Sequence, residues 1–173
     1  MSLRSLALGA PIFITVFLFQ EAFVNQVRLP ASGFTLFLAF AFIWAALSSP
    51  EVGGIAGFGA GLLLDLSSSS AGPFGLWTLI VAGISYGVAF LGYGDDRIQA
   101  NAFSVVTLTV GAVGFAQLAY LLLGTFLGQS IGSLWQVMIT LIGTALWNLL
   151  ITPIIFPVVR TIHSIIYEGR LVA

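Results

Sequence analysis

One stretch of this sequence limits the possible folds more than any other. Residues 98–159 contain no Asp, Glu, Lys or Arg. A helix needs about 20 apolar residues to cross the hydrocarbon core of a bilayer, so this stretch is too long for one crossing. It divides naturally at residues 124–133, GTFLGQSIGS, which are rich in glycine and polar side chains. The sequence therefore predicts two membrane-spanning helices here, one on each side of that segment.

Charged residues elsewhere in the chain separate four more apolar segments. Of the whole chain, 59% is hydrophobic and only 6% is charged, whereas soluble domains carry about 25% charged residues. A globular core cannot hide this much apolar surface in so short a chain. We therefore predict an all-α integral membrane protein with six transmembrane helices in a single domain, residues 1–173. The four further spans are expected within residues 5–20, 29–49, 52–65 and 73–92.

Arginine placement predicts the orientation in the membrane. Short cytoplasmic loops carry an excess of Lys and Arg, and only Arg28 falls on the side opposite the other four arginines. Both termini are therefore expected in the cytoplasm. The first span is expected to be a retained helix, because no small-x-small cleavage site follows it. The net charge of −1 and the absence of a basic stripe predict no nucleic-acid partner.

The third span raises a question about Asp65. Residues 52–64 are too few to cross the hydrocarbon alone, so the helix must carry Asp65 in or near the membrane. Glycines recur every four residues and line the face that Asp65 continues: Gly53, Gly57 and Gly61. Small residues let helix backbones approach closely, so this face is expected to pack against protein. Pro73 is expected to be the first residue of the fourth helix.

Three interpretations of Asp65 follow. The carboxylate is held within the protein by the hydroxyls of serines 67–70 and by the N-terminus of the fourth helix, where free N–H groups carry a partial positive charge. Alternatively, it extends to the outer membrane interface as an ordinary helix-end acid. In the third interpretation it contacts a partner helix or a ligand.

Several stretches resemble the rod shape-determining protein MreD family. They are GGIAGFGAGLLLDL (53–66), GPFGLWTL (72–79), YGVAFLGY (86–93) and WNLLITPIIFPVVR (147–160). The family usually carries a basic cluster after the fourth span, whereas this chain has GDDR (94–97). The matched residues and the glycine face supply our candidates for helix packing or partner contact: Gly53, Gly57, Gly61, Asp65, Pro73, Gly75, Asn148, Pro153, Pro157 and Arg160.

The resemblance implies a non-enzymatic scaffold of the bacterial cell-elongation machinery in the cytoplasmic (inner) membrane. Its expected partner is an MreC-like single-span membrane protein, near MreB filaments, RodA-type and transpeptidase wall synthases, and membrane lipids. The resemblance also implies a fold like that of the substrate-binding subunits of energy-coupling-factor vitamin transporters. Such a subunit is therefore the alternative function. It requires convergent polar side chains in a pocket near the outer surface. Asp65, serines 67–70 and Asn25 are expected on that side without forming a strong constellation, and Gln117, Gln129 and Gln136 are single polar groups.

Two motifs look catalytic without the context that catalysis needs. Residues 83–87, GISYG, match a nucleophile elbow, but they lie inside a predicted span rather than at a strand-to-helix turn. Residues 92–95, GYGD, match a motif of intramembrane aspartyl proteases. Asp65 and Asp95 flank a whole span, about 30 Å of helix, whereas a carboxylate dyad needs near contact. We therefore expect no enzyme, and no acid–base pair for a lipid-processing enzyme.

The last span and the tail complete the prediction. Asn148 is expected to bond to another helix, and Pro153 and Pro157 are expected to kink theirs. Residues 158–173 are expected to form a short amphipathic cytoplasmic tail, with Arg160, His163 and Tyr167 on its polar face. His163 has no second His or any Cys beside it, so we expect no metal site and no cofactor. The apolar face of the tail comprises Val158, Val159, Ile162, Ile165 and Ile166.

Overall fold

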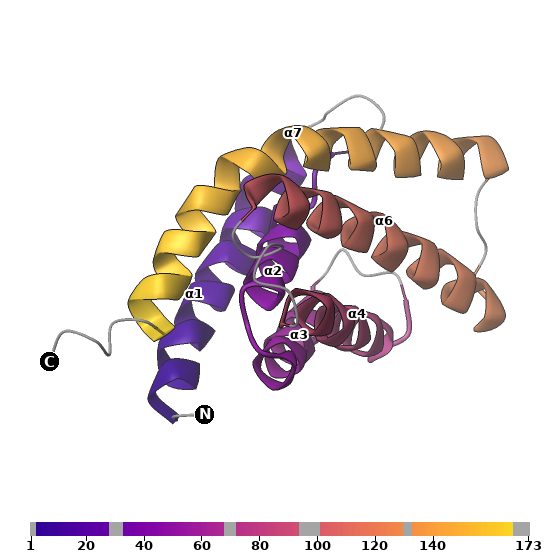
Figure 1. Cartoon of the computed structure of the whole chain (residues 1–173). Coiled ribbons are helices and arrows are strands. Elements are labelled where there is room, and N and C mark those ends of the chain that lie inside the picture. Colours follow the sequence, from indigo (N-terminus) through magenta and orange to yellow (C-terminus); the bar gives the residue numbers. More distant parts are fainter. Residues whose placement is uncertain (1–2, 28–32, 68–71, 94–100, 130–132, 168–173) are drawn as a thin grey trace, which may run out of the picture.

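The structure is a computed structural model that describes residues 3–27, 33–67, 72–93, 101–129 and 133–167, with side chains from Leu8 onward. Helices are the only regular secondary structure in these residues. Each of the six predicted spans contains one α-helix, so the all-α fold class is confirmed. In chain order the elements are α1 (Leu3–Ala22), the 3-10 turn η1 (Val24–Gln26), α2 (Leu36–Ala46), α3 (Pro50–Asp65), α4 (Leu76–Tyr93), α6 (Ala102–Phe126) and α7 (Leu134–Tyr167) (Figure 1).

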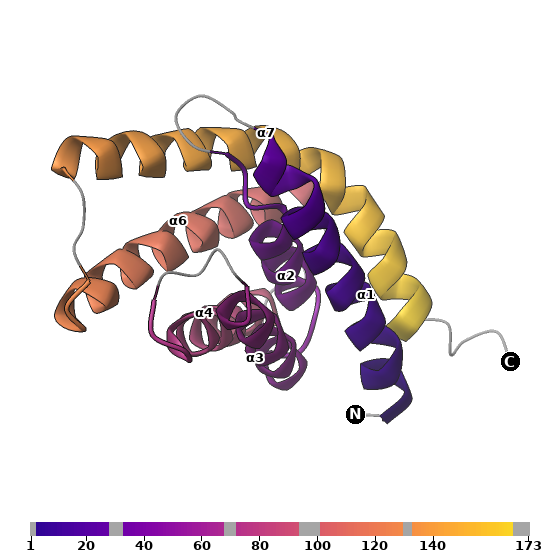
Figure 2. The same cartoon turned by 180° about the vertical axis from the view of Figure 1, so that it is seen from behind.

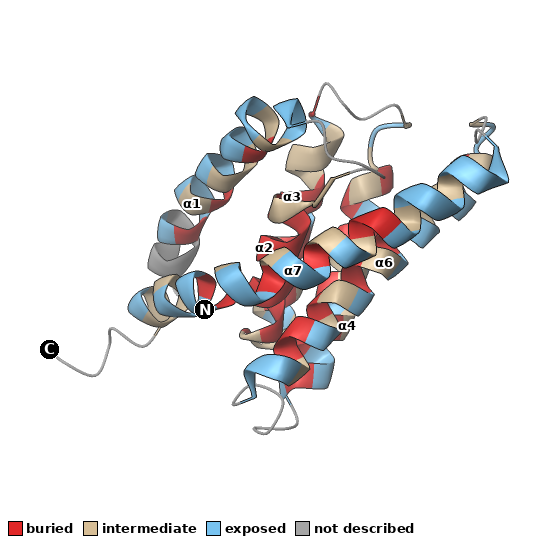
Figure 3. Cartoon of the chain, turned by 90° about the horizontal axis from the view of Figure 1, so that it is seen from above, coloured by how far each residue is buried: buried red, intermediate tan, exposed pale blue. Residues whose placement is uncertain are grey.

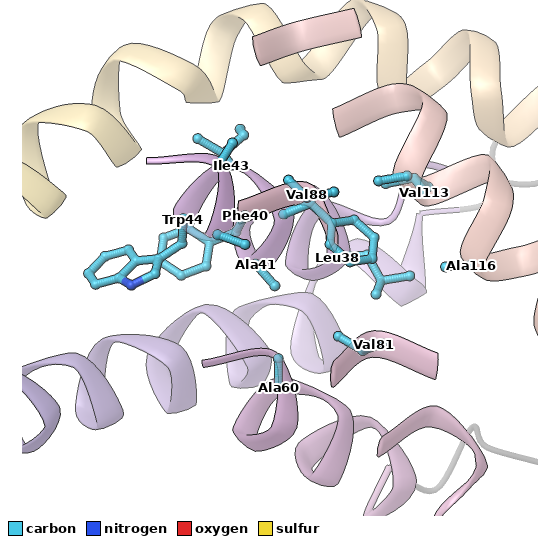
Figure 4. Packing of buried hydrophobic residues seen from close by; sticks show 14 of the residues in the cluster. Leu38, Phe40, Ala41, Ile43, Trp44, Ala60, Val81, Val88, Val113 and Ala116 are labelled. Atoms are coloured by element: carbon cyan, nitrogen blue, oxygen red, sulfur yellow. The ribbon is translucent and has the colours of Figure 1, made fainter. Parts of the chain in front are cut away.

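Helix α2 forms the centre of the molecule. Its sequence LFLAFAFIWAA is apolar on every side, and every residue after Leu36 is buried (Figure 3). A helix that is hydrophobic all round is expected to be surrounded by protein or lipid, and here protein surrounds it. Its side chains belong to one cluster with residues of the five other α-helices. The cluster includes Leu38, Ala41 and Trp44 of α2, Ala60 of α3, Val81 and Val88 of α4, and Val113 and Ala116 of α6 (Figure 4), together with Phe13 of α1 and Phe156 and Val159 of α7.

Four of the helices are long and apolar enough to cross a membrane, which indicates a membrane protein. The crossing segments are Leu8–Gln26, Leu76–Tyr93, Ala102–Phe126 and Leu134–Tyr167. Helices α2 and α3, with 11 and 16 residues, are shorter than a full crossing. Four of the six predicted spans are therefore supported as complete crossings.

The start of α1 and the end of α7 lie at the same end of the molecule, and α3 and α4 run side by side (Figures 1 and 2). The first of these arrangements is compatible with both termini on one side of the membrane. Which side that is stays a prediction.

Helix α7 is longer than the predicted sixth span. It runs without a break from Leu134 to Tyr167, contains Pro153 and Pro157, and bends along its length (Figure 1). Each proline removes a backbone donor from the helix, which favours such a bend. Residues 158–167 therefore continue α7 and do not form a separate helix. Residues 168–173 of the predicted tail lie outside the described residues.

Candidate functional site

The glycine face of α3 packs against α4. A Cβ atom placed on Gly53 would lie 2.5 Å from the Cβ of Ala89. One on Gly57 would overlap the side chain of Ser85, and one on Gly61 would overlap the backbone of Thr78. Only glycine permits this approach, so the close packing predicted for this face is confirmed. The face is used within the chain, against α4.

Asp65, the last residue of α3, binds the first turn of α4. Its Oδ1 accepts the backbone N–H of Trp77 at 3.1 Å, and its Oδ2 accepts the backbone N–H of Thr78 at 2.9 Å. The Thr78 hydroxyl also donates to Oδ2 at 2.5 Å. The first N–H groups of a helix lack partners within the helix, and Asp65 satisfies two of them. These contacts agree with the first of the three interpretations of Asp65, with Thr78 supplying the hydroxyl in place of the serines.

The start of α4 differs from the prediction. Pro73 was expected as its first residue, but α4 begins at Leu76, and the carbonyl of Pro73 accepts the Leu76 N–H in a preceding turn. Gly75 has φ +96°, a conformation that side chains disfavour, and its carbonyl accepts the Leu79 N–H. Gly75 therefore occupies the N-cap position of α4 but has no side chain that could cap the helix. The carboxylate of Asp65 takes that role. Serines 68–70 and the 94–97 loop lie outside the described residues.

Asn148 is fully buried in α7 and bonds to another element, as predicted. Its Nδ2 donates to the Thr144 carbonyl at 2.8 Å and to the Thr35 hydroxyl at 3.2 Å. Thr35 is the cap residue of α2 and makes no side-chain bond to that helix. Asn148 thus ties α7 to the start of α2. Arg160 is exposed, away from these contacts.

A second cap joins α1 to α2. The Oε1 atom of Gln20 accepts the backbone N–H of Phe37 at 3.3 Å, and its Nε2 donates to Asn25 Oδ1 at 2.7 Å. The side chain of Gln20 is buried. Gln20 forms a polar cluster with Glu21, Asn25 and Ser67. The sequence placed Asn25 and Ser67 on this side of the membrane, but gave no sign that Gln20 and Glu21 join them.

The polar cluster borders a partly open cavity of about 290 Å³. Gln117, which looked isolated in the sequence, contributes to it, as does Tyr120. Because the lining comes from α1, η1, α6, α7 and the ends of α2, α3 and α4, sequence spacing gave no sign that these residues converge. The lining residues are Gln20, Glu21, Asn25, Thr35, Phe37, Leu38, Leu64, Ser67, Trp77, Gln117, Tyr120, Leu121, Thr140 and Leu141.

Glu21 is the one charged residue in the described part of the cavity lining. Its Oε1 accepts hydrogen bonds from Asn25 Nδ2 at 3.1 Å and from the Ser67 hydroxyl at 2.9 Å. Ser67, one of the serines considered for Asp65, therefore bonds to Glu21. The carboxylate lies inside the apolar segment Leu8–Gln26, where an ionisable group is costly and commonly functional.

An apolar groove of about 240 Å³ lies between α1 and α3. Small residues from both helices line it: Gly9, Ala10, Ala56 and Gly59. Larger side chains complete it: Phe13, Ile14, Trp44, Val52, Ile55, Leu62, Leu63 and Tyr167. A Cβ placed on Gly59 would have nothing within 4 Å. The groove therefore presents a second face of α3, distinct from the glycine face that α4 covers.

His163 lies on the packed side of α7. Its Nε2 is 3.0 Å from the Ser48 hydroxyl, and its ring lies 5.0 Å from that of Trp44 and 4.5 Å from that of Tyr167. In the same part of the helix, Val158 is exposed and Val159 is buried. The face predicted to be polar is thus partly a packing face, built around the ring of His163.

The motif resembling a nucleophile elbow is an ordinary stretch of helix. Residues 83–87 lie within α4, and Ser85 is fully buried against Gly57. Ser85 is therefore a packing residue, as predicted for this motif, whereas a Cβ placed on Gly83 or Gly87 would meet nothing within 4 Å. Asp95 of the second motif lies outside the described residues.

Comparisons of the chain with protein-family models, with curated proteins and with solved structures gave no match.

Proposed function

We propose that this protein is a non-enzymatic membrane scaffold of the bacterial cell-elongation machinery. It would bind an MreC-like single-span membrane protein and act beside the MreB filaments and wall synthases. Two of the segments that resemble the MreD family, 53–66 and 72–79, contribute to a single unit, the α3–α4 hairpin. The glycine face and the Asp65 cap hold that unit together.

The observation that carries the proposal is the groove between α1 and α3. In lipid, helices associate through close packing of small residues, because apolar surface alone gives no preference for protein over lipid tails. Gly9 and Gly59 allow a third backbone to approach, and the remaining lining is apolar or aromatic. A transmembrane helix without charged side chains matches this chemistry. We assign the groove to the single span of the partner.

Affinity purification in a mild detergent, with mass spectrometry of the bound proteins, tests the proposal. Gly59→Leu places a side chain in open space inside the groove, so the fold should persist while the partner helix is held away. Gly83→Leu is the matched control, because Gly83 is also a helical glycine with nothing within 4 Å, and it does not line this groove. A single-span protein should be recovered with the wild type and with Gly83→Leu, and should be depleted with Gly59→Leu. Equal recovery with both variants contradicts the assignment.

The cavity beside Glu21 favours a second candidate function, the substrate-binding subunit of an energy-coupling-factor transporter. Such a subunit needs convergent polar side chains, and Gln20, Asn25 and Gln117 meet at this cavity. On the predicted topology this end of the molecule faces outward. Recovery of two ATPases and a multi-span coupling subunit in the same purification would replace the scaffold proposal with this one.

A further inference from the structure

We propose that the cavity beside Glu21 binds a small organic cation with a compact apolar or aromatic body. This inference does not rest on the scaffold proposal. If the chain is instead a transporter subunit, the inference names the class of its substrate.

The charge of the lining determines the sign of the charge that a ligand should carry. No Arg, Lys or His is among the lining residues that the structure describes, so Glu21 has no cationic partner among them. Its Oε1 accepts from two neutral donors, whereas Oε2 has no hydrogen bond within the described residues. A carboxylate in a low-dielectric site is normally paired with a cation or with further donors. A ligand ammonium group at Oε2 would complete that pairing, while an anion would be repelled.

A hydrogen-bond network fixes the direction of the carboxylate. The Phe37 N–H donates to Gln20, Gln20 donates to Asn25, and Asn25 donates to Glu21. Ser67 donates to the same oxygen from the end of α3. Glu21 is therefore held by groups from α2, η1 and the end of α3, and Oε2 is left as its free oxygen. Such preorganisation lowers the entropy cost of binding.

The rest of the lining suits the body of an organic cation. Trp77 and Tyr120 stack with ring centroids 4.3 Å apart and an interplanar angle of 14°. The backbone of Trp77 is itself held by Asp65. Aromatic rings attract cations through their faces. The amide of Gln117, which makes no hydrogen bond within the described residues, can donate to or accept from the ligand.

The experiment uses the purified full chain in detergent, without partners, so that its result is independent of the scaffold proposal. Thermal unfolding is measured with three probes that share one phenyl ring: the phenethylammonium ion, neutral 2-phenylethanol and the phenylacetate anion. Phenethylammonium should raise Tm by about 3 °C when its concentration is about ten times Kd, and the other two should not. Equal shifts with 2-phenylethanol would overturn the inference, because they would report partition of the ring alone.

Variants test the assignment to Glu21. Glu21→Gln should weaken phenethylammonium binding about tenfold to a hundredfold, the effect of losing a charged hydrogen-bond partner. Glu51→Gln is the control, because Glu51 is exposed and does not line the cavity. Gln117→Leu removes a lining amide that makes no internal bond, so it should fold normally and weaken binding. It decides the question if Glu21→Gln does not fold. Unchanged affinity in a folded Glu21→Gln or in Gln117→Leu overturns the inference.

Discussion

The hydroxyl of Thr78 donates to the carboxylate of Asp65 at 2.5 Å, and the same carboxylate oxygen accepts the Thr78 backbone N–H at 2.9 Å. The contact joins the last residue of α3 to the first turn of α4. An ionised acid is costly in the membrane, and here the carboxylate of Asp65 caps the neighbouring helix α4. Asp65 thus joins the two helices of the α3–α4 hairpin at one end, and the glycines of α3 let the helices pack closely along their length.

Replacing Asp65 should loosen this hairpin. Asp65→Asn places an NH₂ group where an oxygen now accepts, so it should lower the free energy of unfolding by about 1–2 kcal/mol. Thermal unfolding in detergent measures the loss. Glu51→Gln, a change to an exposed carboxylate in the first turn of α3, should cost less than about 0.5 kcal/mol. If the two variants are equally stable, Asp65 does not act as a cap. A double-mutant cycle with Thr78→Val should show a coupling of about 0.5 kcal/mol or more.

The contact between Gly61 and Thr78 should not tolerate even one methyl group. The Cβ of Gly61→Ala would overlap the backbone of α4, so α3 must move, at a cost of about 1–3 kcal/mol. Gly59→Ala is the control within the same helix, because its Cβ would meet nothing. It should be neutral or stabilising by about 0.5–1 kcal/mol, since alanine favours the helix. Comparison of the two melting temperatures decides the matter, and a stable Gly61→Ala would refute close packing.

Asn148→Leu should weaken the attachment of α7 to α2. The substitution leaves the Thr35 hydroxyl without its bonds to Asn148. Interhelical hydrogen bonds in membrane proteins are worth about 0.6 kcal/mol on average and about 1.7 kcal/mol at most, which sets the expected loss of stability. Gln136→Leu, at an exposed position of the same helix, serves as the control. A loss no greater than that of the control would show that the bond contributes nothing measurable.

His163 should hold one tautomer. The Ser48 hydroxyl donates its only hydrogen to the Trp44 carbonyl at 2.7 Å, so towards His163 it can only accept. In the neutral ring the proton should therefore lie on Nε2, which is 3.0 Å from Ser48. The chain has one histidine, so ¹⁵N-histidine labelling gives an unambiguous NMR signal under alkaline conditions. Ser48→Ala should produce a mixture of tautomers, and an Nδ1–H signal in the wild type would contradict the geometry.

The positions of the helices could be predicted because hydrophobic segments and sparse charges are local signals. The break between α6 and α7, the glycine packing of α3 and the inward bonding of Asn148 all followed from such signals. Helix starts were less predictable. Pro73 indicated a helix start by its type, but the positive φ of Gly75 delays α4 to Leu76.

The polar cavity could not be predicted, for a physical reason. The cap of α2 is supplied by Gln20, which belongs to α1. Cap signals in a sequence lie within a few residues of the helix that they serve, so a cap from elsewhere leaves no trace. The same holds for Glu21 and Gln117, which the fold brings to one cavity from α1 and α6.

The burial of α2 has a consequence for how this protein enters the membrane. A helix of 11 residues rises about 16 Å, roughly half the hydrocarbon thickness. During synthesis such a segment cannot leave the insertion machinery sideways as a stable span of its own. We therefore expect it to enter the bilayer together with the helices that enclose it, so that membrane integration and tertiary folding are coupled for this chain.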